Sequence, residues 1–203
     1  MKPPFPRRWA SFALLLPVLA GCARVVSDPV SLPAEEPRAA PAVDVGDFVP
    51  NRQELQLGEL LTRHPQQQRK TLRHNLLLAY VARMRAVDIA RRGPFSHVNR
   101  DGLGANTLVR RAGYALPRDY DLRPAGNNIE TLGMGYSSAR SAWGSWMGSA
   151  AHRRHLLGLH PIFVEQTEYG VGAAYGYWVV LIARPAADLA SGRPRPIEVM
   201  AGE

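Results

Sequence analysis

Cysteine and long apolar runs are what this chain of 203 residues has least of. Its one cysteine, Cys22, excludes a disulfide framework and any structural zinc site built from several thiolates. No apolar run reaches the roughly 18–20 residues of a membrane-spanning helix, which excludes a crossing by that route. Internal repeats are also absent from the sequence. With 46% hydrophobic and 21% charged residues, the composition is that of a globular protein with one core.

The positive charge of the chain is spread out. Lys and Arg outnumber Asp and Glu by 25 to 17, which gives a formal net charge of +8. The sequence lacks a basic run interleaved with aromatic residues, the pattern that a nucleic-acid groove needs. Single arginines and arginine pairs are typical of solvated helix faces. We therefore expect no nucleic-acid partner.

Residues 1–21 have the pattern of a secretory signal: a positive head, a short apolar stretch and small residues before a cleavage site. The stretch ends in Leu19-Ala20-Gly21-Cys22, which resembles the lipobox of bacterial lipoproteins, where the cysteine becomes the acylated first residue. The alternative is a plain signal peptide with a cysteine nearby by chance. Cleavage would remove three of the 25 basic residues, leaving 22 against 17 acids, or +5.

An acylated Cys22 would tie the chain to a membrane, because each buried methylene contributes ~0.8 kcal/mol. Ala23 follows the cysteine, where an Asp would suggest retention in the inner membrane. We expect an exported protein that is lipid-anchored in the bacterial cell envelope, in the outer membrane if the source is Gram-negative. Its domain would face the periplasm or the extracellular space.

The rest of the chain divides by composition. Residues 22–50 contain five prolines without apolar periodicity, which predicts a Pro-rich tether. A short helical lead-in is expected over 51–65, with an amphipathic stretch at 52–63. The folded domain is expected over 66–184. Residues 185–203 are again rich in Pro and Gly, which predicts a flexible tail.

Apolar periodicity predicts the main elements of the domain. A long helix is expected over 67–92, ended by Gly93-Pro94, with this apolar face buried: Leu77, Tyr80, Val81, Met84 and Val87. Shorter helices are expected over 106–112 and 138–147. Two adjacent strands follow, 169–174 and 177–183, with Gly176 at the turn. Helices before strands predict an α+β layered domain.

Six short motifs, in this order and spacing, resemble the bacterial branch of the CAP superfamily, which unites cysteine-rich secretory proteins, antigen 5 and plant pathogenesis-related proteins. They lie at residues 95–97, 111–114, 126–129, 146–153, 169–172 and 177–180. The resemblance implies a three-layer α-β-α sandwich with a short antiparallel sheet and a long open cleft. The eukaryotic relatives often carry disulfides, which this domain lacks.

The resemblance also implies a cleft with two histidines and two acids. His97 and His152 match the histidines, but Asn127 and Ser149 stand where the family has its carboxylates. Glu130 lies three residues beyond Asn127 and is a substitute acid if the turn is arranged differently. Two imidazoles suit Zn²⁺ or another divalent cation, so His97 and His152 are the candidate metal ligands. Amide and hydroxyl groups in place of acids make this a poor zinc site.

Three functions remain open. The first is a non-enzymatic cleft for a lipid, a sterol or another small apolar or peptide-like ligand, although the aromatic residues of the domain are also what a core contains. The second is a metal-assisted or Ser/His hydrolase of extracellular protein or cell wall. Its candidate nucleophile is Ser149, three residues before His152, where a serine is also typical of a helix N-cap.

The third function is structural: a module that holds an envelope protein. In this hypothesis His97 and His152 hydrogen-bond to Asn127 and Ser149 and lock the loops without metal. The sequence shows no set of nucleophile, base and orienting group, so no catalytic residue is assigned and an enzyme is not favoured.

Overall fold

The computed structural model describes residues 43–186. The predicted signal (1–21), Cys22, most of the tether and residues 187–203 of the tail lie outside the described residues. Within 43–186, no helix is long and apolar enough to cross a membrane.

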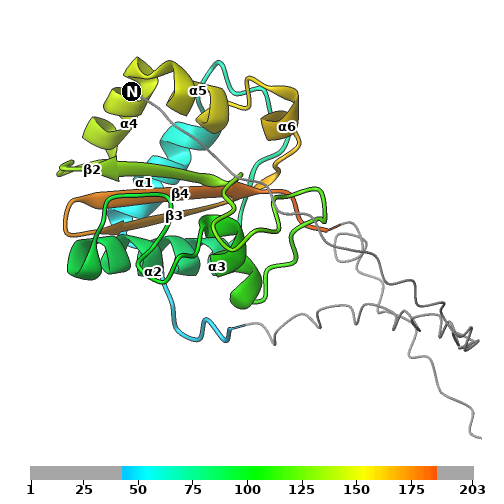
Figure 1. Ribbon diagram of the computed structural model, residues 1–203. Helices are drawn as coiled ribbons and strands as arrows, with labels where there is room; N and C mark the ends of the chain where they lie inside the picture. Colours follow the sequence, from blue (N-terminus) through cyan, green and yellow to red (C-terminus); the bar gives the residue numbers. More distant parts are fainter. Residues whose placement is uncertain (1–42, 187–203) are drawn as a thin grey trace, which may run out of the picture. The chain divides into compact units, whose positions relative to one another are not determined.

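A four-stranded sheet lies between two layers of helices (Figure 1). Helices α2 and α3 cover one face, and α1, α4 and α5 cover the other. This arrangement confirms the α+β class and the three layers. The elements are α1 (Arg52–Thr62), β1 (Arg73–His74), α2 (Leu76–Arg92), α3 (Ala105–Arg111), β2 (Glu130–Met134), α4 (Ala139–Gly148), α5 (Ala150–Leu156), α6 (Pro161–Val164), β3 (Glu168–Ala174) and β4 (Tyr177–Ala183).

The strand order is β1-β3-β4-β2. β3 and β4 form the predicted hairpin, and β2 pairs antiparallel with β4. The expectation of an antiparallel sheet was wrong for β1, which runs parallel to β3. β1 has only two residues, and β2 has only five and contains Gly133, so the sequence shows no clear strand pattern for either.

The long helix α2 begins at Leu76, nine residues after the predicted start. The side chain of Asn75 caps it by accepting a hydrogen bond from the Leu78 amide at 3.1 Å. The predicted buried face was also wrong: of its five residues only Val81 is buried, and Met84 is 42% exposed. The periodicity counted bulky side chains only, whereas the buried face of the helix also includes three small ones, Ala79, Ala82 and Ala86.

Glycines of β3 make this close contact with α2 feasible. A Cβ added to Gly170 would lie 2.1 Å from the backbone nitrogen of Ala79, and one added to Gly172 would lie 2.1 Å from the carbonyl carbon of Ala82. The backbone of the helix therefore rests directly on the backbone of the strand.

We expect Gly170→Ala to lower the free energy of unfolding by about 3 kcal/mol or more, because the new methyl group meets backbone that cannot rotate away. Gly144→Ala is the matched control: Gly144 lies inside α4, and a Cβ there meets nothing within 4 Å. The control is expected to raise stability by about 0.5–1 kcal/mol through helix propensity. Urea unfolding of both variants measures the difference.

The opposite face of the sheet is filled by α1, α4 and α5. Leu57 and Leu61 of α1 are fully buried in the same cluster as Trp146. Asn51 and Glu54 form a capping box at the start of α1, and the buried Glu54 also accepts hydrogen bonds from Arg83. The predicted lead-in helix is thus packed into the core. Helices α3 and α4 match their predictions within one residue, while α5 and α6 were not predicted.

Candidate binding cleft

A cleft of about 360 Å³ runs along the outer edge of β2. Residues 95–97, which follow α2, form one wall, and α4 and α5 form the other. The lining residues are Phe95, Ser96, His97, Leu132, Gly133, Met134, Tyr136, Ser145, Trp146, Ser149 and His152. The fold therefore brings three of the five predicted site residues, His97, Ser149 and His152, to one cavity, and the other two reach it through His97.

Glu130 is the acid of this site. Its carboxylate is fully buried, and its Oε2 lies 2.8 Å from Nδ1 of His97. Its Oε1 accepts a hydrogen bond from Nε of the buried Arg85 at 3.2 Å. A carboxylate that faces a guanidinium can only accept, so the Nδ1–H of His97 donates to Glu130. Nε2 of this half-exposed imidazole is then left as a hydrogen-bond acceptor.

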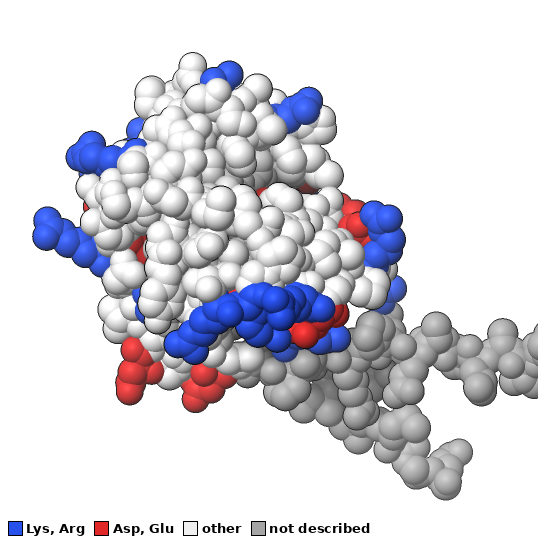
Figure 2. Space-filling model, turned by 60° about the vertical axis from the view of Figure 1, so that its left-hand side comes forward, with Lys and Arg blue, Asp and Glu red and all other residues white. Residues whose placement is uncertain are grey.

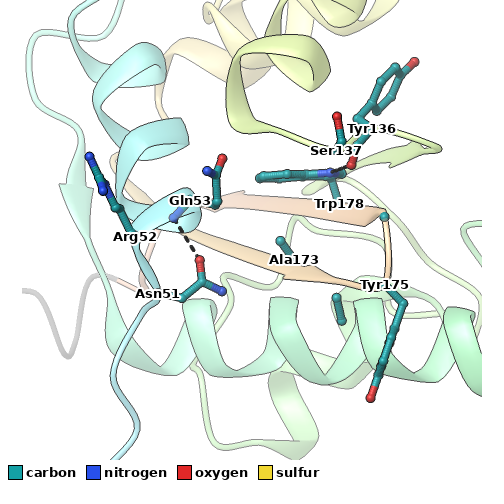
Figure 3. Close-up of a pocket in the computed structure, with 10 residues that line it drawn as sticks. Asn51, Arg52, Gln53, Tyr136, Ser137, Ala173, Tyr175 and Trp178 are labelled. Carbon is teal, nitrogen blue, oxygen red and sulfur yellow. Dashed lines mark hydrogen bonds between the residues drawn. The ribbon is translucent and has the colours of Figure 1, made fainter.

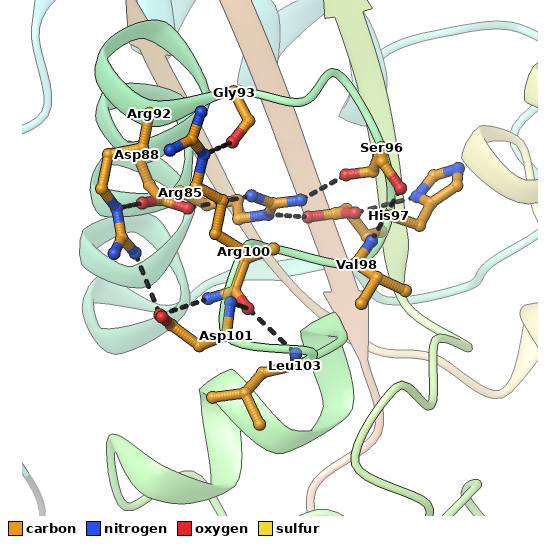
Figure 4. Close-up of polar contacts among 12 residues, drawn as sticks. Arg85, Asp88, Arg92, Gly93, Ser96, His97, Val98, Arg100, Asp101 and Leu103 are labelled. Atoms are coloured by element: carbon orange, nitrogen blue, oxygen red, sulfur yellow. Dashed lines mark hydrogen bonds and ion pairs between the residues drawn. The ribbon is translucent and has the colours of Figure 1, made fainter.

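Arg85 also holds the wall that carries His97 (Figure 4). One of its terminal nitrogens donates to the backbone carbonyl of Ser96, and the other pairs with Asp88 at 3.2 Å. Asp88 in turn pairs with Arg92 at the end of α2. A buried arginine thus ties residues 95–97 and the start of β2 to the long helix.

Asn127 shapes the turn before β2. Its Oδ1 accepts hydrogen bonds from the backbone amides of Ile129 at 3.2 Å and Glu130 at 3.0 Å. Its side-chain nitrogen lies 3.0 Å from Nδ1 of His97. Because Nδ1 of His97 donates to Glu130, it cannot also accept from this nitrogen, so Asn127 lies next to His97 without the predicted hydrogen bond.

The predicted hydrogen bond between Ser149 and His152 is absent from the described structure. Ser149 joins α4 to α5, yet its side chain makes neither the expected cap hydrogen bond nor a hydrogen bond to His152. It takes an extended backbone conformation, and its amide donates to the carbonyl of Trp146 at 3.0 Å. Nδ1 of His152 is buried without a partner, and its ring lies 6.4 Å from that of Trp146. Burial, together with the nearby His97, lowers the pKa of His152, which favours a neutral imidazole.

His155 is a titratable residue that the sequence analysis did not single out. It is buried beneath β2, and its Nδ1 forms a hydrogen bond of 2.7 Å with the Thr131 hydroxyl. Burial first, and then the charge of Arg69, lower the pKa of His155 to about 3. Its place one helical turn after His152 was the available signal. The sequence offered no signal for Arg85, because an arginine among apolar residues is ordinary in a helix.

The residues present do not fit a metal ion. Among residues 43–186, no group of three or more His, Cys, Asp or Glu side chains is arranged to hold one. Nδ1 of His97 is taken by Glu130, and Nδ1 of His152 is buried away from solvent. The one nearby carboxylate faces Arg85. His97 and His152 therefore lack the third ligand that a zinc site requires.

We expect calorimetric titration of the chain with Zn²⁺ to show no saturable binding at micromolar concentrations. A His97→Ala/His152→Ala double variant serves as the control for adventitious binding at other sites. Micromolar binding that disappears in the double variant would contradict the assignment of these histidines as a site without metal.

A second hollow shares a lining residue with the cleft. A hollow of about 410 Å³ lies between the start of α1 and the β3–β4 turn, and Tyr136 lines both it and the cleft (Figure 3). The Tyr136 carbonyl accepts a hydrogen bond from Nε1 of Trp178 at 2.8 Å. On the face shown in Figure 2, a band of basic side chains lies beside acidic ones, and the surface above it is mostly uncharged.

Comparison with known proteins identifies the fold. No protein-family model matches the sequence, and no curated protein matches it significantly. Among solved structures, an outer surface protein of Borrelia burgdorferi matches with a TM-score of 0.50 and 15% identity, over 68% of this chain and 97% of that one. A cysteine-rich secretory protein of Staphylococcus aureus matches with a TM-score of 0.50 and 17% identity, over 65% and 38%.

An extracellular Bacillus anthracis protein containing an SCP domain has a TM-score of 0.48 and 22% identity, over 68% of this chain and 45% of that one. This chain thus spans less than half the length of the Bacillus and Staphylococcus proteins. At identities of 15–22%, the matches describe the fold alone. The described part of the chain shares its fold with the Borrelia outer surface protein and the Staphylococcus cysteine-rich secretory protein, which agrees with the α+β fold that the motifs implied.

Proposed function

We propose that this chain is an exported, membrane-anchored protein whose cleft binds a small, partly apolar ligand without transforming it. The observation that carries the proposal is the composition of the cleft. Its apolar surface comes from Phe95, Leu132, Met134, Tyr136 and Trp146. Such surface with a few convergent polar groups is the usual make-up of a ligand site. The acceptor Nε2 of His97 supplies a polar group.

The alternative, a hydrolase, needs a nucleophile within hydrogen-bond reach of a base. In the described structure neither imidazole of the cleft has a serine hydroxyl as a partner, and Ser149 is free of His152. The hydroxyls of Tyr136 and Ser145 form a hydrogen bond of 2.5 Å with each other. This arrangement favours binding over catalysis.

A blocked cleft tests the proposal. Ser149 lines the cleft and its side chain makes no hydrogen bond, so Ser149→Phe fills the space without breaking a contact. Ser149→Ala is the matched control. The full chain in lipid nanodiscs is offered cholesterol, palmitate and a random heptapeptide pool, and bound ligand is measured by mass spectrometry. Binding of a probe by the parent chain and Ser149→Ala, with loss in Ser149→Phe, supports the site; equal binding by all three chains rules it out.

Export and anchoring rest on the sequence of residues 1–22. The Borrelia protein that shares the fold is named an outer surface protein, which agrees with export. We expect Cys22→Ala to move the mature domain out of the acylated membrane fraction. Labelling with a fatty-acid analogue measures the modification, and labelling that persists in Cys22→Ala would contradict the anchor. The second candidate function is a module that holds an envelope protein, for which the cleft is incidental.

A further inference from the structure

The outer edge of β2 carries unpaired backbone groups. In an antiparallel pair, successive residues alternate between facing the partner strand and facing away. The Ile182 amide donates to the Ile129 carbonyl, and the Gly135 amide donates to the Gly176 carbonyl, both at 2.9 Å. Odd-numbered residues of β2 therefore face β4, and the backbone groups of Leu132 and Met134 face away from the sheet.

A side-chain contact agrees with this direction. The Leu132 carbonyl accepts a hydrogen bond from Nε1 of Trp146 at 2.9 Å. The other outward groups of Leu132 and Met134 are the Leu132 amide and both the amide and the carbonyl of Met134, and none has a hydrogen-bond partner within residues 43–186. Met134 itself is 50% exposed. Three backbone groups are thus left for a ligand.

The edge is open because the two helical layers stop on either side of it. Residues 95–97 and α4–α5 form the walls, and residues 132–134 form the floor of the cleft. His97 lies beyond the edge of the sheet in Figure 4. Proteins usually protect an edge strand with charges, prolines or a covering element. Residues 132–134 are Leu, Gly and Met, and the Trp146 indole covers only one of the outward carbonyls.

We propose that the cleft takes an extended peptide segment, which adds to the free edge of β2 as a further strand. The alternation of backbone donors and an acceptor is matched by another backbone and not by a sterol or an acyl chain. This inference rests on the proposed function and names the class of its ligand. Alternate peptide side chains would face Phe95 and His97 on one wall and Trp146 and His152 on the other.

The two walls define the preferred peptide. β2 has five residues, so a segment of about five residues at ~3.3 Å each matches its length. Phe95 and Met134 are large and exposed, so an apolar peptide side chain fits between them. The acceptor Nε2 of His97 selects a neighbouring side chain that donates a hydrogen bond, such as a hydroxyl or an amide.

Met134→Pro tests the proposal. The substitution removes an outward amide that does not belong to the β2–β4 ladder, and proline is tolerated on an edge strand for this reason. Met134→Leu keeps the amide and a similar side chain. The full chain in nanodiscs is used to select binders from a random heptapeptide pool. The selected peptide is then titrated against the parent chain and both variants, and equal melting temperatures establish that the variants are folded.

We expect Met134→Pro to bind the peptide about tenfold more weakly, because one hydrogen bond is lost and the peptide carbonyl is left unpaired. We expect Met134→Leu to bind the peptide as the parent chain does. Equal binding by Met134→Pro would overturn strand addition. Selection of no peptide, while cholesterol or palmitate binds in a manner blocked by Ser149→Phe, would overturn the inference and leave the proposed function standing. Binding of none of the probes would overturn both.

Discussion

Arg85→Met should lower the free energy of unfolding by about 3–5 kcal/mol, because it leaves the carboxylate of Glu130 buried without a counter-charge. Both side chains of this pair are almost completely inaccessible to solvent. The substitution also removes the hydrogen bond that ties the Ser96 carbonyl to α2. We therefore expect the wall that carries His97 to loosen along with the loss of stability. Urea unfolding at neutral pH measures the free energy.

The double variant Arg85→Met/Glu130→Met is the control. A buried ion pair replaced as a whole by apolar side chains of similar volume costs far less than one broken in half. The double variant should therefore be more stable than Arg85→Met alone. Additive losses from the two substitutions would show that each residue acts through other contacts and that the pair does not organise the site.

His155 should make the stability of the domain fall in acid. Its pKa is 6.5 in the unfolded chain and about 3 in the folded domain, because burial disfavours the charged ring. Between these values the unfolded chain binds more protons, so stability is complete above pH 6.5 and falls as the pH drops toward 3. The contribution to the slope is at most ~1.4 kcal/mol per pH unit. The lowered pKa of His152 acts in the same direction.

His155→Gln removes this titration and should give a flatter dependence of the unfolding free energy on pH between 6.5 and 3. Thr131→Val is the matched control, because it removes the hydrogen bond to Nδ1 and leaves the imidazole in place. It should lower stability by about 1–3 kcal/mol at neutral pH while keeping the acid slope. An acid slope in His155→Gln equal to that of the parent chain would contradict the assignment.

The sequence predicted elements well where the pattern was local. The continuous apolar residues of β4 and the Gly176 turn placed the hairpin correctly, and helix α4 was found within one residue. The buried face of α2 was missed because its closest contacts with the sheet are made where Ala79 and Ala82 meet Gly170 and Gly172. Such contacts depend on how closely two backbones approach, which residue periodicity does not report.

The site was predicted only in part, because several of its contacts also depend on how distant parts of the chain fold together. His97 and His152 were found from motifs, and the structure places both in the cleft. The role of Glu130 depended on the turn at Asn127, whose side chain accepts from the amides of Ile129 and Glu130. Arg85 lies 45 positions before Glu130 in the chain, so their ion pair is a product of the fold alone. The bond between Ser149 and His152 was predicted and is absent, because Ser149 joins two helices in an extended conformation.

The central claim is that the cleft holds its ligand without changing it. The most direct measurement is a single-turnover experiment in which the full chain, in excess over a bound heptapeptide, is incubated for hours and the peptide is then released and its mass measured. The account predicts full recovery at the original mass from the parent chain and from His152→Ala alike. Cleaved peptide from the parent chain, with intact peptide from His152→Ala, would contradict it and make His152 part of a catalytic site.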